Sequence, residues 1–306
     1  MAFFLGIDGG GTKTECVVGD ETRVLGSSFG STVKIKKVGT EAARKALTTA
    51  VRAVCREAGV DAHNIAHTCI GIAGSSIREV IDWAHKILGE LVSGDVTVVN
   101  DALIAHQAAF HGKAGVLVIA GTGSHVLGMN ERGEVERAGG WGPIISDEGS
   151  GFWIGRLAVS QAMRAYDCTH SVKLLDGIME AWKLVSVEEV VSMANSNPPP
   201  DFASLLPAIL SCADSGDPLA REILTSSAAE LANLARIVIR RLWPMPAKIT
   251  VAVTGGVFAH SSHIGQMFAN AIRAERPDVN VNLEPVHPVM GALSMARQKV
   301  DVARLG

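Results

Sequence analysis

Residues 6–20, with the sequence GIDGGGTKTECVVGD, place an aspartate, a glycine cluster, two threonines and a lysine between two apolar runs. Glycine permits positive φ angles and a close approach of the backbone, so such a cluster beside lysine and threonine is typical of a phosphate-binding loop. Asp8 lies at the end of the first apolar run, where its carboxylate would hold Mg²⁺ through water, because protein-bound magnesium keeps several waters. The backbone N–H groups expected to surround phosphate oxygens are those of Gly10, Gly11, Thr12 and Lys13.

Two common phosphate-binding motifs do not fit this stretch. Thr14 occupies the third glycine position of the dinucleotide fingerprint G-x-G-x-x-G, and Thr12 separates Gly11 from Lys13 where a Walker A loop has them adjacent. Both motifs also continue into a helix, whereas the following residues, TECVVG, are rich in β-branched side chains and predict a strand. We therefore expect a hairpin turn that binds phosphate, and a glycine-rich hairpin without a ligand is the alternative.

A second glycine turn occurs more than a hundred residues later. The sequence AGTGS at residues 120–124 again lies between apolar runs. Two such turns facing one cleft would clamp a polyphosphate. The hydroxyls of Thr122 and Ser124 can reach phosphate, although they equally suit hydrogen bonds that close their own turn. The second set of expected phosphate-binding residues is Gly121, Thr122, Gly123 and Ser124.

The elements that would position these turns form a repeated series. Three predicted strands are followed by helix, strand, helix, strand and helix, and the order restarts near residue 115 with a long helical stretch inserted. This pattern predicts an α/β fold of two similar domains, residues 1–112 and 113–306, with a cleft between them. The insertion covers about residues 150–245, and the last helix would pack back on the first domain. The first long helix is expected from Thr40 as N-cap to Gly59 as C-terminal stop.

The composition narrows the class of protein. The chain has 306 residues, 47% of them hydrophobic and 19% charged, which is ordinary for a soluble enzyme. A net charge of -3 without a basic cluster argues against nucleic-acid or anionic-membrane partners. The five cysteines are scattered, no uncharged run is long enough to span a bilayer, and Asp8 interrupts the apolar start, which is unlike a signal peptide. We expect a cytoplasmic protein.

Five segments between residues 6 and 258 carry a family resemblance: GIDGGGTKT, VVNDA, IAGTGS, GGWGPIISDEGSGFWIG and VAVTGGVF. Together they resemble the superfamily of sugar kinases, actin and heat-shock chaperone ATPases. More narrowly, the chain is similar to the branch that holds the eukaryotic-type N-acetylglucosamine kinases and the BadF/BadG/BcrA/BcrD-type ATPases. The resemblance implies two ribonuclease H-like (actin-like ATPase) domains flanking a nucleotide cleft, with ATP and Mg²⁺ as cofactors and a homodimer as the assembly.

The resemblance also implies roles for single residues. Asp101, in VVNDA, would be the catalytic base that accepts the proton of a sugar hydroxyl. A helix N-cap is its alternative role, because aspartate is favoured there. Gly255 and Gly256 would let adenosine lie against the backbone, with a plain strand-to-helix turn as the alternative. Asp147 would bind sugar hydroxyls, and capping of the following helix is the competing or additional role.

The predicted sugar site contains one departure from the family pattern. Lys34 stands where N-acetylglucosamine kinases have an asparagine, so we consider an acceptor that carries negative charge, such as N-acetylmuramate. A solvated basic loop is the alternative. The full set of predicted sugar-binding residues is Lys34, Gly74, Ser75, Asp101, Gly139, Gly140 and Asp147.

Three functions remain open on the sequence. The first is ATP-dependent phosphorylation of a hydroxyl of an amino sugar of the N-acetylglucosamine, glucosamine or N-acetylmuramate class. The second is a BadF-type ATPase that acts as an activator or energy-coupling subunit of another enzyme. The third is a nucleotide-regulated binding protein.

Overall fold

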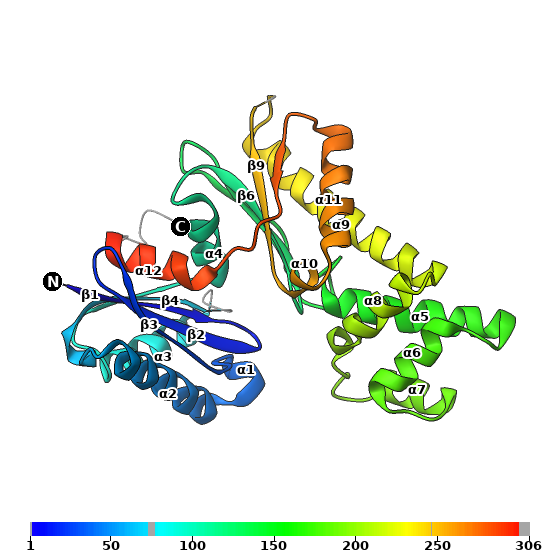
Figure 1. Cartoon of the computed structure of the whole chain (residues 1–306), viewed down its shortest axis with the longest axis horizontal. Coiled ribbons are helices and arrows are strands. Elements are labelled where there is room, and N and C mark those ends of the chain that lie inside the picture. Colours follow the sequence, from blue (N-terminus) through cyan, green and yellow to red (C-terminus); the bar gives the residue numbers. More distant parts are fainter. Residues whose placement is uncertain (1, 73–76, 246, 300–306) are drawn as a thin grey trace. The chain divides into compact units, whose positions relative to one another are not determined.

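Two five-stranded sheets with surrounding helices organise the chain (Figure 1). The computed structural model describes residues 2–72, 77–245 and 247–299. These residues form two compact units. The first contains the described residues up to Gly115, residues 129–135, and the described residues from Val286 onward. The second contains Val116–Gly128 and the described residues of Glu136–Pro285.

The sheet of the first unit has the order β3-β2-β1-β4-β5. β1 pairs antiparallel with β2 and parallel with β4, and β4 pairs parallel with β5. The strands are β1 (Phe3–Gly9), β2 (Lys13–Gly19), β3 (Val24–Ser31), β4 (Ile65–Ile72) and β5 (Asp95–Val99). The helices are α1 (Ile35–Val38), α2 (Thr40–Ala58), the 3-10 turn η1 (Ala62–Asn64), α3 (Arg78–Gly89), α4 (Asp101–Phe110) and α12 (Pro288–Gln298).

Helices cover both faces of this first sheet, as Figure 1 shows. Leu5 and Ile7 of β1 are buried against α2 and α3, whereas Phe4, which precedes Leu5, is buried with α4 and α12. Successive side chains of a strand point to opposite faces, so this central strand is apolar on both sides. The last helix, α12, therefore completes the core of the first unit.

The sheet of the second unit has the order β10-β9-β6-β7-β8, the same order when read from its other edge. Its strands are β6 (Gly115–Ala120), β7 (Ser124–Met129), β8 (Val135–Gly139), β9 (Thr250–Thr254) and β10 (Asn280–Asn282). Its helices are α5 (Gly151–Thr169), α6 (Lys173–Trp182), α7 (Val187–Ala194), the 3-10 turn η2 (Phe202–Leu205), α8 (Leu206–Asp214), α9 (Pro218–Leu242), α10 (Gly256–His260) and α11 (Ser262–Glu275).

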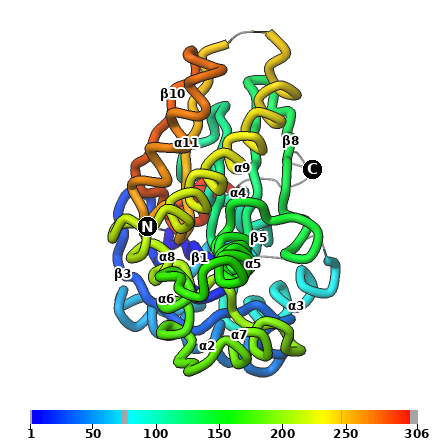
Figure 2. Tube along the Cα trace, turned by 90° about the vertical axis from the view of Figure 1, so that its right-hand side faces the viewer, coloured from blue at the N-terminus to red at the C-terminus, as the bar shows by residue number. Residues whose placement is uncertain are grey.

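The predicted helical insertion is present in this second unit. Helices α5 to α9 lie between β8 and β9, whereas only α1, α2 and the short turn η1 lie between the corresponding strands β3 and β4 of the first unit. α9 and α11 lie side by side, as Figure 2 shows. Among the described residues, no helix combines the length and apolar character that crossing a membrane requires.

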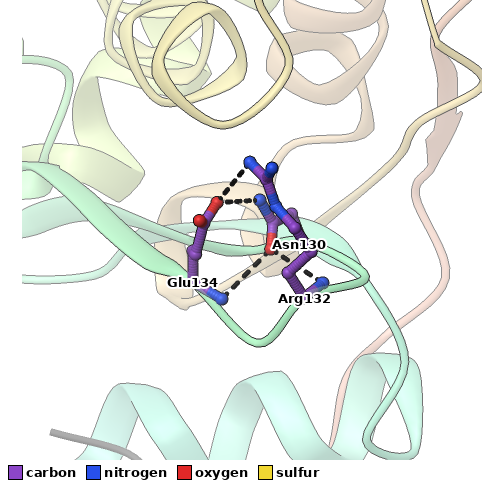
Figure 3. A network of polar contacts seen from close by, with 3 residues as sticks. All are labelled: Asn130, Arg132 and Glu134. Atoms are coloured by element: carbon purple, nitrogen blue, oxygen red, sulfur yellow. Dashed lines mark hydrogen bonds and ion pairs between the residues drawn. The ribbon is translucent and has the colours of Figure 1, made fainter.

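Polar side chains close the connection between β7 and β8 (Figure 3). Asn130 Oδ1 accepts the backbone N–H groups of Arg132 and Glu134, both at 3.0 Å. Asn130 Nδ2 donates to Glu134 Oε2 at 2.6 Å, and the Arg132 guanidinium lies 2.7 Å from the same oxygen. Asparagine is favoured in such turns because its short side chain can satisfy nearby backbone N–H groups.

One helix boundary differs from the sequence prediction. Thr40 is the first residue of α2, and its N-cap is Gly39, which has φ 81°. The short helix α1 ends at Val38, so the chain must turn sharply before α2, and the positive φ at Gly39 provides that turn. The predicted C-terminal stop is confirmed, because Gly59 caps α2 with φ 65°.

Gly291 allows α12 to pack directly on the backbone of α4. A methyl group at this position would overlap the carbonyl oxygen of Ile104 and lie 2.7 Å from the backbone nitrogen of Ala108. We expect Gly291→Ala to lower the free energy of unfolding by about 2 kcal/mol or more, because an overpacked core must shift its backbone. Chemical denaturation measures this change.

Gly89→Ala is the matched control for that substitution. Gly89 is also helical, but a methyl group there would meet nothing within 4 Å. Alanine loses less conformational freedom than glycine on folding, so this variant should be as stable as the wild type or gain up to about 1 kcal/mol. Equal destabilisation by both substitutions would contradict the packing explanation.

Candidate active site

The glycine turn of the first unit joins β1 to β2 and is held by residues that follow β3. Thr32 Oγ1 donates to the carbonyl oxygen of Gly10 at 2.8 Å and accepts the N–H of Lys34 at 3.1 Å. Lys37 Nζ donates to the carbonyl oxygen of Gly11 at 3.5 Å. In both hydrogen bonds to the turn, the acceptor is a carbonyl oxygen of the turn. This arrangement suits a turn whose N–H groups donate to phosphate.

Lys34 lies beside this same turn. Its Cδ would be 3.9 Å from a methyl group placed at Gly11. Lys37 is bonded to Gly11, as described above. The segment around Lys34, which the family resemblance assigns to sugar binding, thus brings lysine side chains to the predicted phosphate turn.

Lys13 directs its ammonium group along the sheet. Its Nζ lies 3.8 Å from Glu15 Oε2 and 4.8 Å from the centroid of the Phe29 ring. The side chain is 66% exposed, so both contacts contribute little to stability.

Asp8 and Asp101 come together at the carboxyl edge of the first sheet. Asp8 pairs in register with Gly71 of β4, which pairs with Val99 of β5, and Asp101 follows Val99 by two residues. Burial raises the pKa of Asp8 to about 7, and the negative charge of Asp101 is the next contribution. Glu15 raises this pKa further, whereas Lys13 lowers it.

The N-cap of α4 is Asn100, not Asp101. Asn100 Oδ1 accepts the N–H of Ala102 at 2.9 Å, while Asp101 Oδ1 lies 3.1 Å from the same N–H. Asn100 therefore fills the N-cap role that was the alternative for Asp101, and the start of α4 is explained without Asp101.

The glycine turn of the second unit, residues 121–123, rests on the first turn of α5. Gly121 N–H donates to the carbonyl oxygen of Gly123 at 2.9 Å, which makes the turn tight. Gly151 N–H donates to the carbonyl oxygen of Gly121 at 2.8 Å, and Phe152 N–H donates to that of Thr122 at 3.2 Å. The turn therefore satisfies N–H groups that a helix N-terminus leaves without intrahelical partners.

The hydroxyl of Ser124 is used inside the protein. Ser124 is 2% exposed, and its Oγ donates to the carbonyl oxygen of Glu148 at 2.6 Å. This bond joins the end of the turn to a distant segment, so it is not the bond within the turn that was the alternative to phosphate binding. Asp147, one residue before Glu148, is also buried, at 6% exposed, and burial raises the pKa of its carboxyl. Ser150 caps α5 through its Oγ and Trp153 N–H, so Asp147 is not the N-cap.

The third glycine turn lies beside the second. Gly255 has φ 103° and joins β9 to α10, which begins at Gly256. A methyl group at Gly255 would overlap the carbonyl oxygen of Ala120, the last residue of β6. Since β6 and β9 are parallel neighbours, both turns lie at the carboxyl ends of adjacent strands, where open α/β sheets bind ligands.

The loop that contains the remaining predicted sugar residues has an unusual backbone and surface. Gly139 and Gly140 have φ 73° and 74°. Beyond them the loop exposes apolar side chains, with Ile144 93% and Ile145 77% exposed. Gly74 and Ser75, the other two predicted sugar residues, lie outside the described residues.

The sequence analysis did not identify two residues that support the candidate site. Asn100 had a readable signal, because asparagine before a helical run is a preferred N-cap. Thr32 had none, because its role depends on β3 bringing it back beside the turn after β1. Among the described residues, no group of three or more His, Cys, Asp or Glu side chains is arranged to hold a metal ion.

The duplicated sheet order and the glycine turns at the strand ends define an actin-like ATPase fold with two ribonuclease H-like units. Within that class, the chain belongs to the BadF/BadG/BcrA/BcrD ATPase family, which it matches over residues 5–296. The resemblance and the fold expected from the sequence are thereby confirmed.

Two relatives cover almost the whole chain. An N-acetylmuramic acid/N-acetylglucosamine kinase of Clostridium acetobutylicum is 30% identical over 98% of this chain and 100% of its own. An N-acetyl-D-glucosamine kinase of Dictyostelium discoideum is 30% identical over 96% of this chain and 97% of its own. A crystal structure of a Chromobacterium violaceum protein has a TM-score of 0.75 and 23% identity, and it covers 96% of this chain and 98% of the other.

The raised pKa of Asp8 makes stability depend on pH in the metal-free protein. The ordinary value is 3.8 and the folded value about 7, so the folded state keeps a proton that the unfolded state has lost between these pH values. Stability therefore falls as pH rises from about 4 to about 7 and stays low above it. We expect Asp8→Asn to gain stability over the wild type as pH rises from 4 to 8, by at most about 4 kcal/mol. Denaturation in chelator across this range measures the gain, and a pH-independent difference would contradict it.

Proposed function

We propose that this protein is an ATP-dependent kinase that phosphorylates a hydroxyl of an amino sugar, with Asp101 as the catalytic base. The observation that carries the proposal is the meeting of Asp8 and Asp101 beside the glycine turn at residues 10–12. A carboxylate near the acceptor and a phosphate-binding turn are the parts that phosphoryl transfer requires. The two kinases that are 30% identical along nearly the full chain support an amino sugar as the acceptor.

The proposed step is transfer of the terminal phosphoryl group of ATP. The sugar hydroxyl oxygen forms a bond to the γ-phosphorus, the bond from that phosphorus to the bridging oxygen breaks, and ADP leaves. Asp101 accepts the hydroxyl proton as the new bond forms. Because Asn100 caps α4, the Asp101 carboxylate can act on a substrate without giving up the start of the helix.

Mg²⁺ fits the residues present. Asp8 would hold it through water, with Asp101 as the neighbouring carboxylate, and the remaining positions would be filled by water and phosphate. When bound, the ion supplies positive charge that neutralises the phosphate oxygens. Burial and the nearby Asp101 make the ionised form of Asp8 unfavourable. A cation at this position would offset that free-energy cost.

We propose roles for the remaining site residues as well. The first-unit turn and the second-unit turn would both bind phosphate oxygens of ATP, and the turn at Gly255 and Gly256 would contact adenosine. The proposed phosphate ligands are Gly10, Gly11, Thr12, Lys13, Gly121, Thr122, Gly123 and Ser124. The proposed sugar residues besides Asp101 are Lys34, Gly74, Ser75, Gly139, Gly140 and Asp147. We also propose a cytoplasmic homodimer that acts on a small sugar and has no nucleic-acid or membrane partner.

Asp101→Asn should remove the base while keeping its size and its place beside Asn100. We expect kcat for sugar phosphorylation to fall about 10²- to 10⁴-fold, because general-base catalysis contributes that much. ADP release measured over a panel of neutral and acidic amino sugars tests both the activity and the acceptor. Asp95→Asn is the control, since that aspartate is 86% exposed at the start of β5 and should leave kcat unchanged.

Two results of that assay would reject the kinase. ADP release that no sugar stimulates would favour an ATPase of the activator type. ATP binding without turnover, unaffected by Asp101→Asn, would favour a nucleotide-regulated binding protein.

Lys34 gives a test of acceptor charge. If its ammonium pairs with a carboxylated sugar, Lys34→Ala should raise KM for N-acetylmuramate about tenfold or more and leave KM for N-acetylglucosamine unchanged, because a charged hydrogen bond is lost. Lys36→Ala is the control, as Lys36 is an exposed lysine of α1, the short helix for which Lys34 is the N-cap.

Lys34 also lies beside Gly11 of the proposed phosphate turn, so the result that would contradict a sugar contact is a role at ATP alone. A lysine that served ATP phosphate alone would, when removed, raise KM for ATP equally with either sugar. Steady-state kinetics with both sugars and varied ATP separates the two roles.

A further inference from the structure

A cavity of about 400 Å³ lies within the second unit, between α8 and the end of α10. This volume falls in the range of small-molecule sites, about 300 to 1,000 Å³. Four of the lining residues follow one another at the spacing of a single helix face on α8, and the other two come from the ends of α8 and α10. The lining residues are Pro207, Leu210, Ser211, Asp214, Ser215 and His260.

His260 connects this cavity to the third glycine turn. It is the last residue of α10, the helix that begins at Gly256. A methyl group at Gly256 would lie 3.9 Å from Cδ2 of the His260 ring, so the ring reaches back to the start of its helix. The turn at Gly255 contacts Ala120, directly before the second-unit phosphate turn. A ligand with its phosphates at residues 121–123 would therefore have the cavity within reach of its other end.

The lining of the cavity suits a nucleobase better than an anion. Among the described residues that line it, none is a lysine or arginine, and the Asp214 carboxylate repels phosphate. The carboxyl end of α8 adds negative partial charge at the same wall. Pro207 and Leu210 offer apolar contact to a flat ring. The Asp214 carboxylate accepts hydrogen bonds, whereas the two serine hydroxyls can also donate them.

We propose that this cavity binds the adenine base of ATP, and that Asp214 selects adenine by accepting a hydrogen bond from its exocyclic amino group. The inference rests on the proposed function in taking ATP as the nucleotide. It goes further, because a backbone contact at Gly255 and Gly256 does not distinguish one base from another. Adenine presents an amino donor beside a ring nitrogen acceptor, which matches a carboxylate flanked by Ser211 and Ser215.

Inosine triphosphate (ITP) is the informative comparison, because its base carries a carbonyl oxygen where adenine carries the amino group. A carbonyl oxygen facing the Asp214 carboxylate would oppose two acceptors with no proton between them. We expect the wild type to bind ATP about tenfold more tightly than ITP, as for one hydrogen bond to a charged group. Calorimetry with Mg²⁺ and without sugar measures both Kd values.

Asp214→Asn should remove this preference. An amide donates as well as accepts, so it suits the carbonyl oxygen of ITP as well as the amino group of ATP. We expect Kd for ATP to rise and Kd for ITP to fall until the two agree within about twofold, since the charged acceptor is replaced by a neutral one. Asp214 is exposed at the end of α8, so the substitution should leave the fold intact.

Asp201→Asn is the matched control for charge. Asp201 is another exposed acid of the helical insertion, directly before η2, and it does not line the cavity. Its substitution removes the same charge and should leave the preference for ATP unchanged.

His260→Ala tests the other wall of the cavity. Loss of the ring contact should raise Kd for both nucleotides about fivefold or more, as for loss of an aromatic ring stacked on a base. The ratio of the two Kd values should stay that of the wild type, because such a contact does not involve the amino group.

Equal affinity of the wild type for ATP and ITP, or a preference that Asp214→Asn retains, would overturn the proposal. Unchanged Kd values in His260→Ala would overturn the placement of the base in this cavity. None of these measurements depends on turnover, so sugar-stimulated ADP release judges the kinase separately. If no sugar is phosphorylated but the ATP preference is present and lost in Asp214→Asn, the kinase assignment fails and this inference stands.

Discussion

Parallel pairing of β1, β4 and β5 is the constraint on which the first half of the site depends. Parallel strands end at one edge of a sheet, so residues far apart in the sequence are delivered to one place. Asp8 and Asp101 belong to different strands and loops, yet the register Asp8 to Gly71 to Val99 brings them within electrostatic range. Outside the sheet, α12 packs on β1 and α4, and Gly291 permits its close approach to α4.

The second unit uses the same device with different chemistry. β6 and β9 end side by side, and each continues into a glycine turn. In the first unit the turn is held by hydrogen bonds from Thr32 and Lys37 to its carbonyl oxygens. In the second unit the first turn of α5 holds it, and the carboxyl of Asp147 lies against Gly123. The repeated sheet order thus fixes where the turns lie, while the support for each turn is specific to its unit.

Much of the fold could be predicted because its signals are local. Glycine clusters between β-branched runs predicted the turns, and the repeated order of strands and helices predicted the two α/β units. The supports for the turns could not be predicted, because they depend on contacts between distant segments. Thr32 and Ser227 are ordinary hydroxyl residues until the fold brings them to Gly10 and Gly149. Asp147 was identified from its motif, but its burial against Gly123 depends on the path of residues 139–147.

The distribution of charge explains why a cation belongs with the two carboxylates of the first unit. Burial and the neighbouring acids raise the pKa of Asp8, and Lys13 is the one opposing charge among the causes of that shift. Lys13 also interacts with Glu15 and the Phe29 ring at an exposed position, where solvent screens its charge. An ionised Asp8 near Asp101 therefore receives little compensation from the side chains around it. A divalent ion that keeps its own water would supply that charge without further protein ligands, and it would be most needed when phosphate adds more negative charge.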